Sequence, residues 1–297
     1  MKAAKVPAGP CARNRRRRQR PYTNVVFAGG GNRCFWQAGF WSVAAPLLQL
    51  APRRVVAVSA GSAIACTLFA GTFDQAFANY KRAIADNQRN VYLRNLLREQ
   101  PIFPHGLMYR DAILGTMDAP ALLRLHQGPS IHVLISCPPV WASPVLTIAL
   151  GVLAAGWDAW GKEQVHQSAG SRIGFKPLYV PVQDCSTPPD LADLIIASSC
   201  IPPLTPRRRI RGVAPLDGGL VSNVPIDGLA EKNGNTLVLL TRRFAVLPSF
   251  SGRTYVQPSQ AIPVGAWDYT NDAALQATYD LGRRDAEKFC ERKGHFL

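Results

Sequence analysis

The hydrophobic pattern of the chain alternates short apolar runs with longer stretches of helical spacing. Each short apolar run predicts a strand, and these runs are residues 23–28, 54–58, 130–136, 178–182 and 235–241. Apolar positions recur at helical spacing after the first two runs, and again in residues 71–124, 190–199 and 271–293. Strands that alternate with helices predict an α/β fold with a central, mostly parallel sheet.

Residues 54–66 have the pattern of a strand, a tight turn and a helix, with Ser59 at the turn. Small residues, Ala57 and Gly61, stand two positions on either side of this serine. A strained turn of this kind exposes a serine hydroxyl at the end of a strand and leaves no room for bulky neighbours. One interpretation is a nucleophilic serine, and the other is a small-residue turn that only lets the helix pack on the sheet.

A glycine-rich loop, Gly29, Gly30 and Gly31, links the first predicted strand to a helix that we expect to end near Pro52. Glycines let backbone N–H groups point into a cavity at a helix N-terminus, which favours an anion there. That anion is either a phosphate or a transient oxyanion. The dinucleotide-binding pattern does not fit, because Cys34 stands at its third glycine position, and the P-loop pattern is absent.

Ser59 and the glycine-rich loop both follow strands of one predicted β-α-β unit. Consecutive parallel strands with a right-handed crossover are usually neighbours in the sheet, so their carboxyl ends share one edge. Ligands of open α/β folds bind at that edge. We therefore expect the loop and Ser59 to meet in space.

Composition and charge divide the chain into a tail and a domain. With 297 residues, 47% of them hydrophobic, the chain can bury a large core, and we expect one domain at residues 21–297. Net charge is +15, and no acidic residue precedes Asp74. The arginine-rich residues 1–20 repel one another and have little to bury, which predicts a disordered basic tail. That tail serves solubility alone, contacts anionic lipid headgroups, or contacts nucleic acid.

Cysteine usage and an apolar segment bear on the compartment. The seven cysteines form no Cys-x-x-Cys pair, and residues 1–20 lack the apolar core of a signal peptide. These features predict reduced thiols, no zinc or other metal site, and a cytoplasmic protein. Residues 138–160 are mostly apolar, but their unbroken apolar run, 145–155, is short of the about 20 residues of a membrane span, and Pro138, Pro139 and Pro144 interrupt the segment. They form either a buried or lid-covering helix or a shallow helix that docks peripherally on a membrane.

A serine nucleophile needs a base, and the chain offers Asp217 or a histidine. Only His295 follows a plausible aspartate in the order serine, aspartate, histidine, and it lies two residues from the C-terminus. Asp217 follows an apolar stretch and precedes Gly218 and Gly219, so it can be partly buried, which raises the basicity of a carboxylate. A Ser59–Asp217 dyad beside amide donors is a workable acyl-transfer site. The alternative for Asp217 and its glycines is a plain turn.

Four linked motifs resemble the patatin-like phospholipase family in order and spacing. These motifs are residues 29–33, 57–61, 197–202 and 217–225. The resemblance implies a three-layer α/β/α fold with a central mostly parallel sheet, and hydrolysis of lipid acyl esters through an acyl-enzyme without metal or organic cofactor. It also implies Ser59 as nucleophile, Asp217 as base, an oxyanion hole of Gly29, Gly30 and Gly31, and support of that hole by Arg33. The further supporting positions are Ala57, Gly61, Gly218, Gly219 and Asn223.

Two positions depart from the family pattern. Ala57 replaces the first glycine of the serine turn, and Cys34 replaces the glycine that usually follows the basic residue of the loop. Either change could displace Ser59 or distort the hole.

The main prediction is a serine acyl hydrolase for lipid esters, in the first place phospholipids, with no nucleic-acid partner. A basic stretch at residues 207–211 either faces an anionic headgroup or is a solvated loop. The alternative is a patatin-fold protein that no longer turns over and binds a membrane or a partner protein. An esterase assisted by His295 is a third alternative. Acyl position, headgroup, natural acyl acceptor and oligomeric state stay open.

Overall fold

The computed structural model describes residues 22–97, 101–143, 145–149, 165–166, 170–205, 207–229 and 234–294. The predicted basic tail and His295 lie outside these residues. The strands are β1 (Asn24–Phe27), β2 (Arg54–Val58), β3 (Ser130–Cys137), β4 (Lys176–Pro181), β5 (Leu216–Asp217), β6 (Thr236–Leu239) and β7 (Arg253–Val256). The α-helices are α1 (Phe35–Leu47), α2 (Ala60–Ala70), α3 (Phe73–Asp86), α4 (His105–Leu114), α5 (Ala119–Gln127), α7 (Pro188–Ser198) and α8 (Asp272–Arg292). The 3-10 helices are η1 (Gly31–Cys34), η2 (Leu93–Leu97), η3 (Gly170–Ile173), η4 (Val182–Asp184), η5 (Gly218–Leu220) and η6 (Ile226–Gly228).

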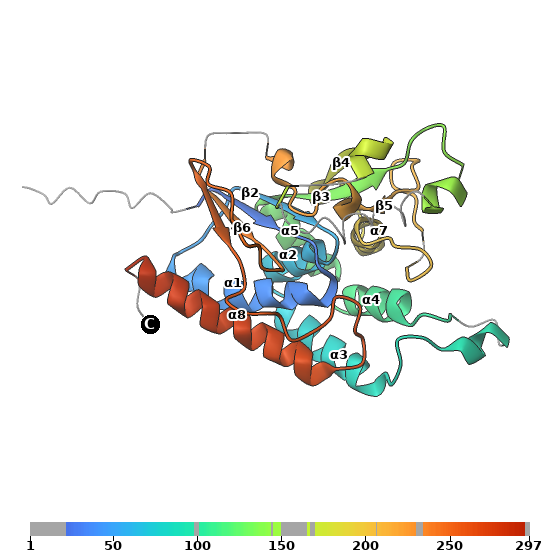
Figure 1. The fold of residues 1–297 in the computed structure, drawn as a ribbon, viewed down its shortest axis with the longest axis horizontal. Helices are drawn as coiled ribbons and strands as arrows, with labels where there is room; N and C mark the ends of the chain where they lie inside the picture. The colour runs from blue at the N-terminus through green and yellow to red at the C-terminus, as the bar shows by residue number, and fades with distance from the viewer. Residues whose placement is uncertain are drawn as a thin grey trace, which may run out of the picture.

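The strands form one mixed sheet in the order β4-β3-β2-β1-β6-β7, and β5 pairs with β3 (Figure 1). Strands β3, β2, β1, β6 and β7 run parallel, whereas β4 and β5 run antiparallel to β3. The register aligns Phe27 with Ala57, and Val58 with Leu134. This arrangement confirms the predicted α/β fold with a mostly parallel central sheet flanked by helices. Strands β5 and β7 were not predicted.

Side chains of the parallel strands alternate between the two faces of the sheet. Val25, Phe27 and Val55 face the main core, which they share with buried side chains of α1, α2, α5 and α8. Val26 and Val58 face the other way and pack in two smaller clusters. In the described chain, those clusters include residues of the short helices η5 and η6. The strands are buried on both faces, which explains why they read as continuous apolar runs.

Helix α1 ends earlier than expected. Its last residue is Leu47, although the sequence predicted an end near Pro52. Gln49 adopts a φ of 51°, so the chain leaves the helix through a left-handed residue before the proline is reached. Helix α1 lies beside the helix α8 (Figure 1). Near the start of α1, Trp36 Nε1 donates a hydrogen bond to Asp285 Oδ2 at 2.8 Å.

The apolar segment that follows β3 is described only in part, at residues 138–143 and 145–149. Within these residues, Trp141 is 66% exposed and Val145 is 79% exposed, whereas Thr147 is buried. The described part therefore exposes two of its apolar side chains, and the remainder of the segment lies outside the described residues. Among the helices that the structure describes, none combines the length and the apolar character that a membrane crossing requires.

Candidate active site

Ser59 lies at the turn between β2 and α2, and only 5% of its surface is exposed. Its backbone has φ 54° and ψ −139°, and a residue other than glycine pays about 1–3 kcal/mol for such a conformation. Gly61 suits this turn because a Cβ there would come within 2.5 Å of the Ala28 carbonyl oxygen. The strand, tight turn and helix predicted around Ser59 are therefore present.

Ser198, the last residue of α7, holds the strained turn in place. The Ser59 amide donates a hydrogen bond to Ser198 Oγ at 2.8 Å, and Ser198 Oγ donates to the Leu134 carbonyl oxygen at 2.6 Å. The turn is thus tied to α7 and to β3. Sequence reasoning assigned Ser198 no role of its own. It stood only within a motif of the resemblance, and the contact with Ser59 has no local signal.

Asp217, at the end of β5, faces Ser59. Ser59 Oγ donates a hydrogen bond to Asp217 Oδ2 at 2.6 Å, and the Gly219 amide donates to Asp217 Oδ1 at 2.6 Å. Burial raises the pKa of Asp217 to about 6, although the hydrogen bonds from Ser59 and Gly219 act to lower it. At neutral pH the carboxylate is therefore ionised, and it is a stronger base than an exposed aspartate.

The backbone of Asp217 is fixed as firmly as its side chain. Its amide donates to the Cys200 carbonyl oxygen at 2.8 Å, and its own carbonyl oxygen accepts a hydrogen bond from Ser136 Oγ at 2.8 Å. Gly218 lies directly against the Leu134 carbonyl, which leaves no space for a side chain. The predicted Asp217-Gly218-Gly219 turn is therefore also the element that aims the carboxylate.

The glycine-rich loop follows β1 and lies beside Ser59: a Cβ placed on Gly29 would be 3.3 Å from the Cβ of Ser59. The Gly29 amide already donates to the Asn223 carbonyl oxygen at 3.0 Å. This engagement corrects the expectation that Gly29 donates to an oxyanion. The amides of Gly30 and Gly31 make no hydrogen bond with another described residue, so they are the candidate donors.

The direction of each candidate amide is set by the carbonyl that shares its peptide group. Because the peptide is planar and trans, a fixed C=O also fixes the N–H that points the opposite way. The Gly29 carbonyl accepts hydrogen bonds from Asn223 Nδ2, at 3.3 Å, and from Thr241 Oγ1, which orients the Gly30 amide. The Gly30 carbonyl accepts from Arg33 Nε at 3.3 Å, which orients the amide of the next residue. Arg33 and Asn223 thus help to orient two peptide groups of the glycine-rich loop.

Asn32 anchors the same loop, although sequence reasoning gave it no role. Its amide donates to the Ala266 carbonyl oxygen at 3.0 Å, and its Nδ2 donates to the Asp268 carbonyl oxygen at 2.7 Å. Tyr80 donates from its hydroxyl to Asn32 Oδ1 at 2.8 Å. Burial raises the pKa of Tyr80 well above its ordinary value, so the phenol stays protonated and keeps this bond. Gly31 must be glycine here, because its φ is 56° and a Cβ would lie 2.2 Å from the Ala266 oxygen.

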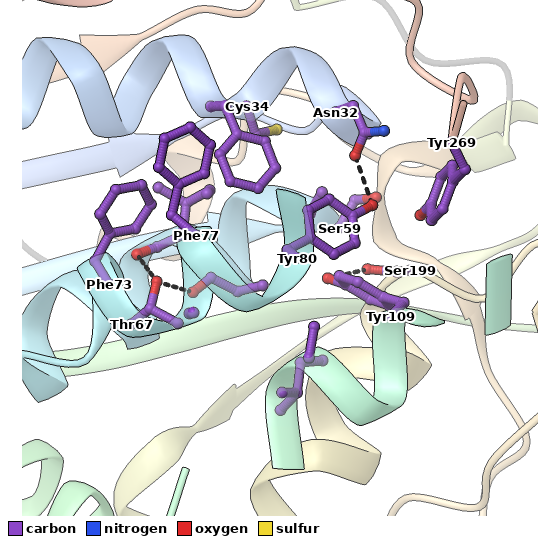
Figure 2. A pocket seen from close by; sticks show the side chains of 18 of the residues that line it. Asn32, Cys34, Ser59, Thr67, Phe73, Phe77, Tyr80, Tyr109, Ser199 and Tyr269 are labelled. Atoms are coloured by element: carbon purple, nitrogen blue, oxygen red, sulfur yellow. Dashed lines mark hydrogen bonds between the residues drawn. The ribbon is translucent and has the colours of Figure 1, made fainter. Parts of the chain in front are cut away.

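A pocket runs from Ser59 along α2 towards α3 (Figure 2). Polar side chains gather at the Ser59 end, where Tyr109 and Ser199 share a hydrogen bond of 3.2 Å between their hydroxyl oxygens. Aromatic side chains gather at the other end, where Figure 2 shows Phe73 and Phe77 beside Thr67. Among its described lining residues, the pocket thus has a polar end with the hydroxyl of Ser59 and an apolar end without charged groups.

The two departures from the family pattern are accommodated. Ala57 is fully buried in the sheet, where it pairs with Phe27 and Val133, and Ser59 still reaches Asp217. Cys34 is also fully buried, and its thiol donates to the Ala28 carbonyl oxygen at 3.5 Å. Neither position therefore removes the pairing of serine and carboxylate.

The described histidines hydrogen-bond elsewhere. Their ring nitrogens meet the Trp267 carbonyl (His105), the Cys185 carbonyl (His126), Ser130 Oγ (His132) and the Tyr255 hydroxyl (His166). Two arginines of the basic stretch at residues 207–211 face acids, because Arg208 Nε lies 3.3 Å from Asp193 Oδ1 and Arg211 contacts Asp184. That stretch is thus partly neutralised within the protein.

The fold and this site define an α/β protein with a serine at a strand–helix turn, beside a buried carboxylate and a glycine-rich loop. Residues 25–230 match the family described as patatin-like phospholipase. Because this match covers more than half of the chain, the protein belongs to the patatin-like phospholipase family. Membership suggests a lipid acyl hydrolase.

Comparison with solved structures finds a likeness to a known crystal structure. The crystal structure of VipD from Legionella pneumophila is similar with a TM-score of 0.44 and 10% sequence identity, over 92% of this chain and 67% of that chain. No curated protein matches this sequence.

Proposed function

We propose that this protein is a serine acyl hydrolase that cleaves acyl esters of lipids, in the first place phospholipids, through a Ser59–Asp217 dyad. The observation that carries the proposal is the 2.6 Å hydrogen bond from Ser59 Oγ to a buried carboxylate, beside two amides that bond to no other described residue. Family membership supports the same reaction class.

In the acylation step, Asp217 Oδ2 takes the proton of Ser59 Oγ as that oxygen forms a bond to the ester carbonyl carbon. The carbonyl oxygen becomes an oxyanion and accepts hydrogen bonds from the amides of Gly30 and Gly31. The bond between the carbonyl carbon and the alcohol oxygen then breaks. The departing alcohol takes the proton from Asp217, and the acyl group stays on Ser59.

In the deacylation step, a water molecule attacks the acyl carbon and gives a proton to Asp217. The same amides stabilise the second oxyanion. The bond between the carbon and Ser59 Oγ breaks, and Ser59 regains the proton from Asp217 as the fatty acid leaves. A pKa of about 6 suits Asp217 to this double role, because the carboxylate is ionised at neutral pH yet basic enough to take a proton.

The test compares hydrolysis of p-nitrophenyl esters and of phospholipid vesicles by the wild type, Ser59→Ala and a control. The control is Ser42→Ala, which removes a hydroxyl whose bond within the described part of the chain is to the Gly39 carbonyl of the same helix. We expect Ser59→Ala to lose activity by about 10⁴-fold or more, as for other serine nucleophiles, and Ser42→Ala to keep it. Equal turnover by wild type and Ser59→Ala would refute the proposal.

The same assay addresses the proposal that the fold only binds. A protein that floats with vesicles but hydrolyses none of these esters, even at high concentration, would support an idle patatin fold. The intact pairing of Ser59 with Asp217 favours turnover over that alternative.

A further inference from the structure

The apolar end of the Ser59 pocket is built differently from the rest of the site. One wall is the face of α2 that carries Ala63, Ile64 and Thr67. From Ser59 to Thr67 this face extends about 12 Å, at the helical rise of 1.5 Å per residue. Alanine at position 63 leaves space that a larger side chain would fill. The pocket therefore continues along the helix from the serine.

The hydroxyl of Thr67 does not make this end of the pocket polar. The Thr67 hydroxyl donates to the Ala63 carbonyl at 2.8 Å and to the Ile64 carbonyl at 3.0 Å (Figure 2). A threonine so engaged behaves as an apolar wall, because its polar hydrogen is already satisfied within the helix. The surface suits a hydrocarbon.

Aromatic side chains of α3 close the far end. Phe73 and Phe77 stack with their ring centroids 5.5 Å apart, and both pack on Tyr279 of α8, at 5.8 and 5.1 Å. Phe73 is 6% exposed and Phe77 is 9% exposed, so they form a buried wall. Close-packed aromatic rings of this kind do not yield to an additional methylene without strain.

The pocket is also narrow. Its free volume is about 60 Å³, which is room for roughly four to six water-sized groups, and a single row of them, each about 2.8 Å across, is about 11–17 Å long. A site for a whole drug-sized ligand usually has at least about 300 Å³. One slender chain therefore fits beside Ser59, whereas a whole lipid does not.

We propose that this apolar end is an acyl-chain site that admits one unbranched chain of medium length, about that of an octanoyl group, and that Phe73 and Phe77 set the upper limit. The proposal rests on the proposed function, since it places the acyl group of the ester on the Ser59 side of the pocket. The alcohol part of the lipid stays at the polar end.

The test measures kcat/KM for p-nitrophenyl acetate, butyrate, octanoate and palmitate. Octanoate is the best substrate of the wild type, and palmitate is poor because its chain meets the aromatic wall. Phe73→Ala raises the ratio of palmitate to octanoate turnover by about tenfold or more, and Ala63→Leu lowers the ratio of octanoate to acetate turnover by a similar factor. Equal turnover of octanoate and palmitate by the wild type overturns the proposal.

Matched controls separate a change of the pocket from a change of packing. Phe289→Ala removes a ring that is 6% exposed, as Phe73 is, but that packs on Phe40 away from the pocket. Ala45→Leu enlarges a half-buried alanine of α1 that packs against the core outside the pocket. Both controls keep the chain-length profile of the wild type. If Phe73→Ala fails to fold, Phe73→Leu gives the same shift in a smaller amount.

Binding distinguishes this proposal from the catalytic one. Ser59→Ala is titrated with sodium octanoate and with sodium palmitate, and its Tm is followed. Octanoate raises the Tm more than palmitate does, and addition of Ala63→Leu abolishes the rise. If no ester is hydrolysed but octanoate binds in this way, the catalytic proposal fails and the chain site stands. If esters are hydrolysed with a flat profile and octanoate gives no shift, the chain site fails alone.

Discussion

The two ends of the Ser59 pocket are held together by different forces. At the polar end, each group that faces the reaction is fixed by hydrogen bonds from distant parts of the chain, such as Ser198 on Ser59 and Thr241 on the glycine-rich loop. At the apolar end, Phe73 and Phe77 are held by packing against α8. Hydrogen bonds fix direction, whereas packing fixes volume.

Because of this difference, substitutions at the two ends of the pocket are expected to change different kinetic quantities. Loss of a hydrogen bond at the polar end moves an atom that acts in the transition state, so kcat falls for every ester alike. A change of volume at the apolar end alters how well one chain fits relative to another, so the ratio between esters changes. The predictions below test this separation.

The largest effect after loss of Ser59 itself is expected at Asp217. Asp217→Asn keeps the shape of the side chain but removes the base, so turnover falls by about 10²–10⁴-fold. Acetate and octanoate lose the same factor. Asp74→Asn, in the exposed first turn of α3, is the control and keeps full activity. A change in the ratio of octanoate to acetate turnover in Asp217→Asn would contradict the separation between the two ends of the pocket.

Gly31→Ala comes next. The new Cβ would lie 2.2 Å from the Ala266 carbonyl oxygen and would displace the loop, so turnover falls by about 10²–10³-fold, the usual cost of one oxyanion donor. Gly71→Ala is the matched control, since Gly71 has a φ of 69° but no atom of a described residue lies within 4 Å of a new Cβ. Gly71→Ala introduces similar backbone strain outside the glycine-rich loop. It is therefore expected to lower the stability of the protein and to leave turnover unchanged. Similar kinetic losses in both variants would argue against an oxyanion role for the loop.

Low pH is expected to lower turnover, which depends on the polar end, and to leave the chain-length preference of the apolar end unchanged. Asp217 has a pKa raised to about 6, and only its ionised form accepts the proton of Ser59. kcat/KM therefore falls tenfold per pH unit below pH 6, and at pH 4.5 it is about 30-fold below its plateau. The octanoate to acetate ratio stays constant over the same range. A pH profile that is flat down to pH 4.5 would contradict Asp217 as the base.

Asn32→Ala has a smaller effect. It removes the bond that Tyr80 donates to Asn32 and the bond that Asn32 donates to the Asp268 carbonyl, so the loop loses two of its anchors. We expect kcat to fall by about tenfold, within the range that misplacement of a reacting group causes, and KM to stay unchanged. Tyr80→Phe removes one of these bonds and gives a partial loss. A rise in KM for the octanoate ester, but not for the acetate ester, would instead indicate that Asn32 supports the acyl-chain site.

His295→Ala is expected to have no effect. The Ser59 hydroxyl already donates to Asp217, so no imidazole is needed to take its proton. The measurement is kcat/KM for p-nitrophenyl acetate. A loss of about 10²-fold or more, the least that general-base catalysis typically contributes, would support the histidine-assisted alternative.

Much of the fold could be predicted because its signals are local. Strands β1 and β2 are buried on both faces, so they read as apolar runs, and the turn at Ser59 has small residues at the positions that its backbone requires. Strand β7 was missed because it is short, partly exposed and at the edge of the sheet, where no continuous apolar run is needed. Strand β5 has only two residues, too few for any periodic pattern.

Only those residues of the candidate site that stand in sequence motifs could be predicted. Ser59 and Asp217 stand in recognisable turns, but Asn32 and Ser198 act through partners on distant parts of the chain. Nothing in the local sequence indicates such contacts. The engagement of the Gly29 amide by Asn223 is another tertiary fact that three consecutive glycines do not reveal. Phe73 and Phe77 read as the apolar face of an ordinary helix, so the end of the pocket became visible only in three dimensions.

The most direct test of the account is the site at which a fluorophosphonate probe attaches. The wild type and Ser59→Ala are treated with the probe, digested and mapped by mass spectrometry. The account predicts an adduct on the peptide that contains Ser59 in the wild type and none in Ser59→Ala. Equal labelling of both proteins, or an adduct on another serine, would contradict it.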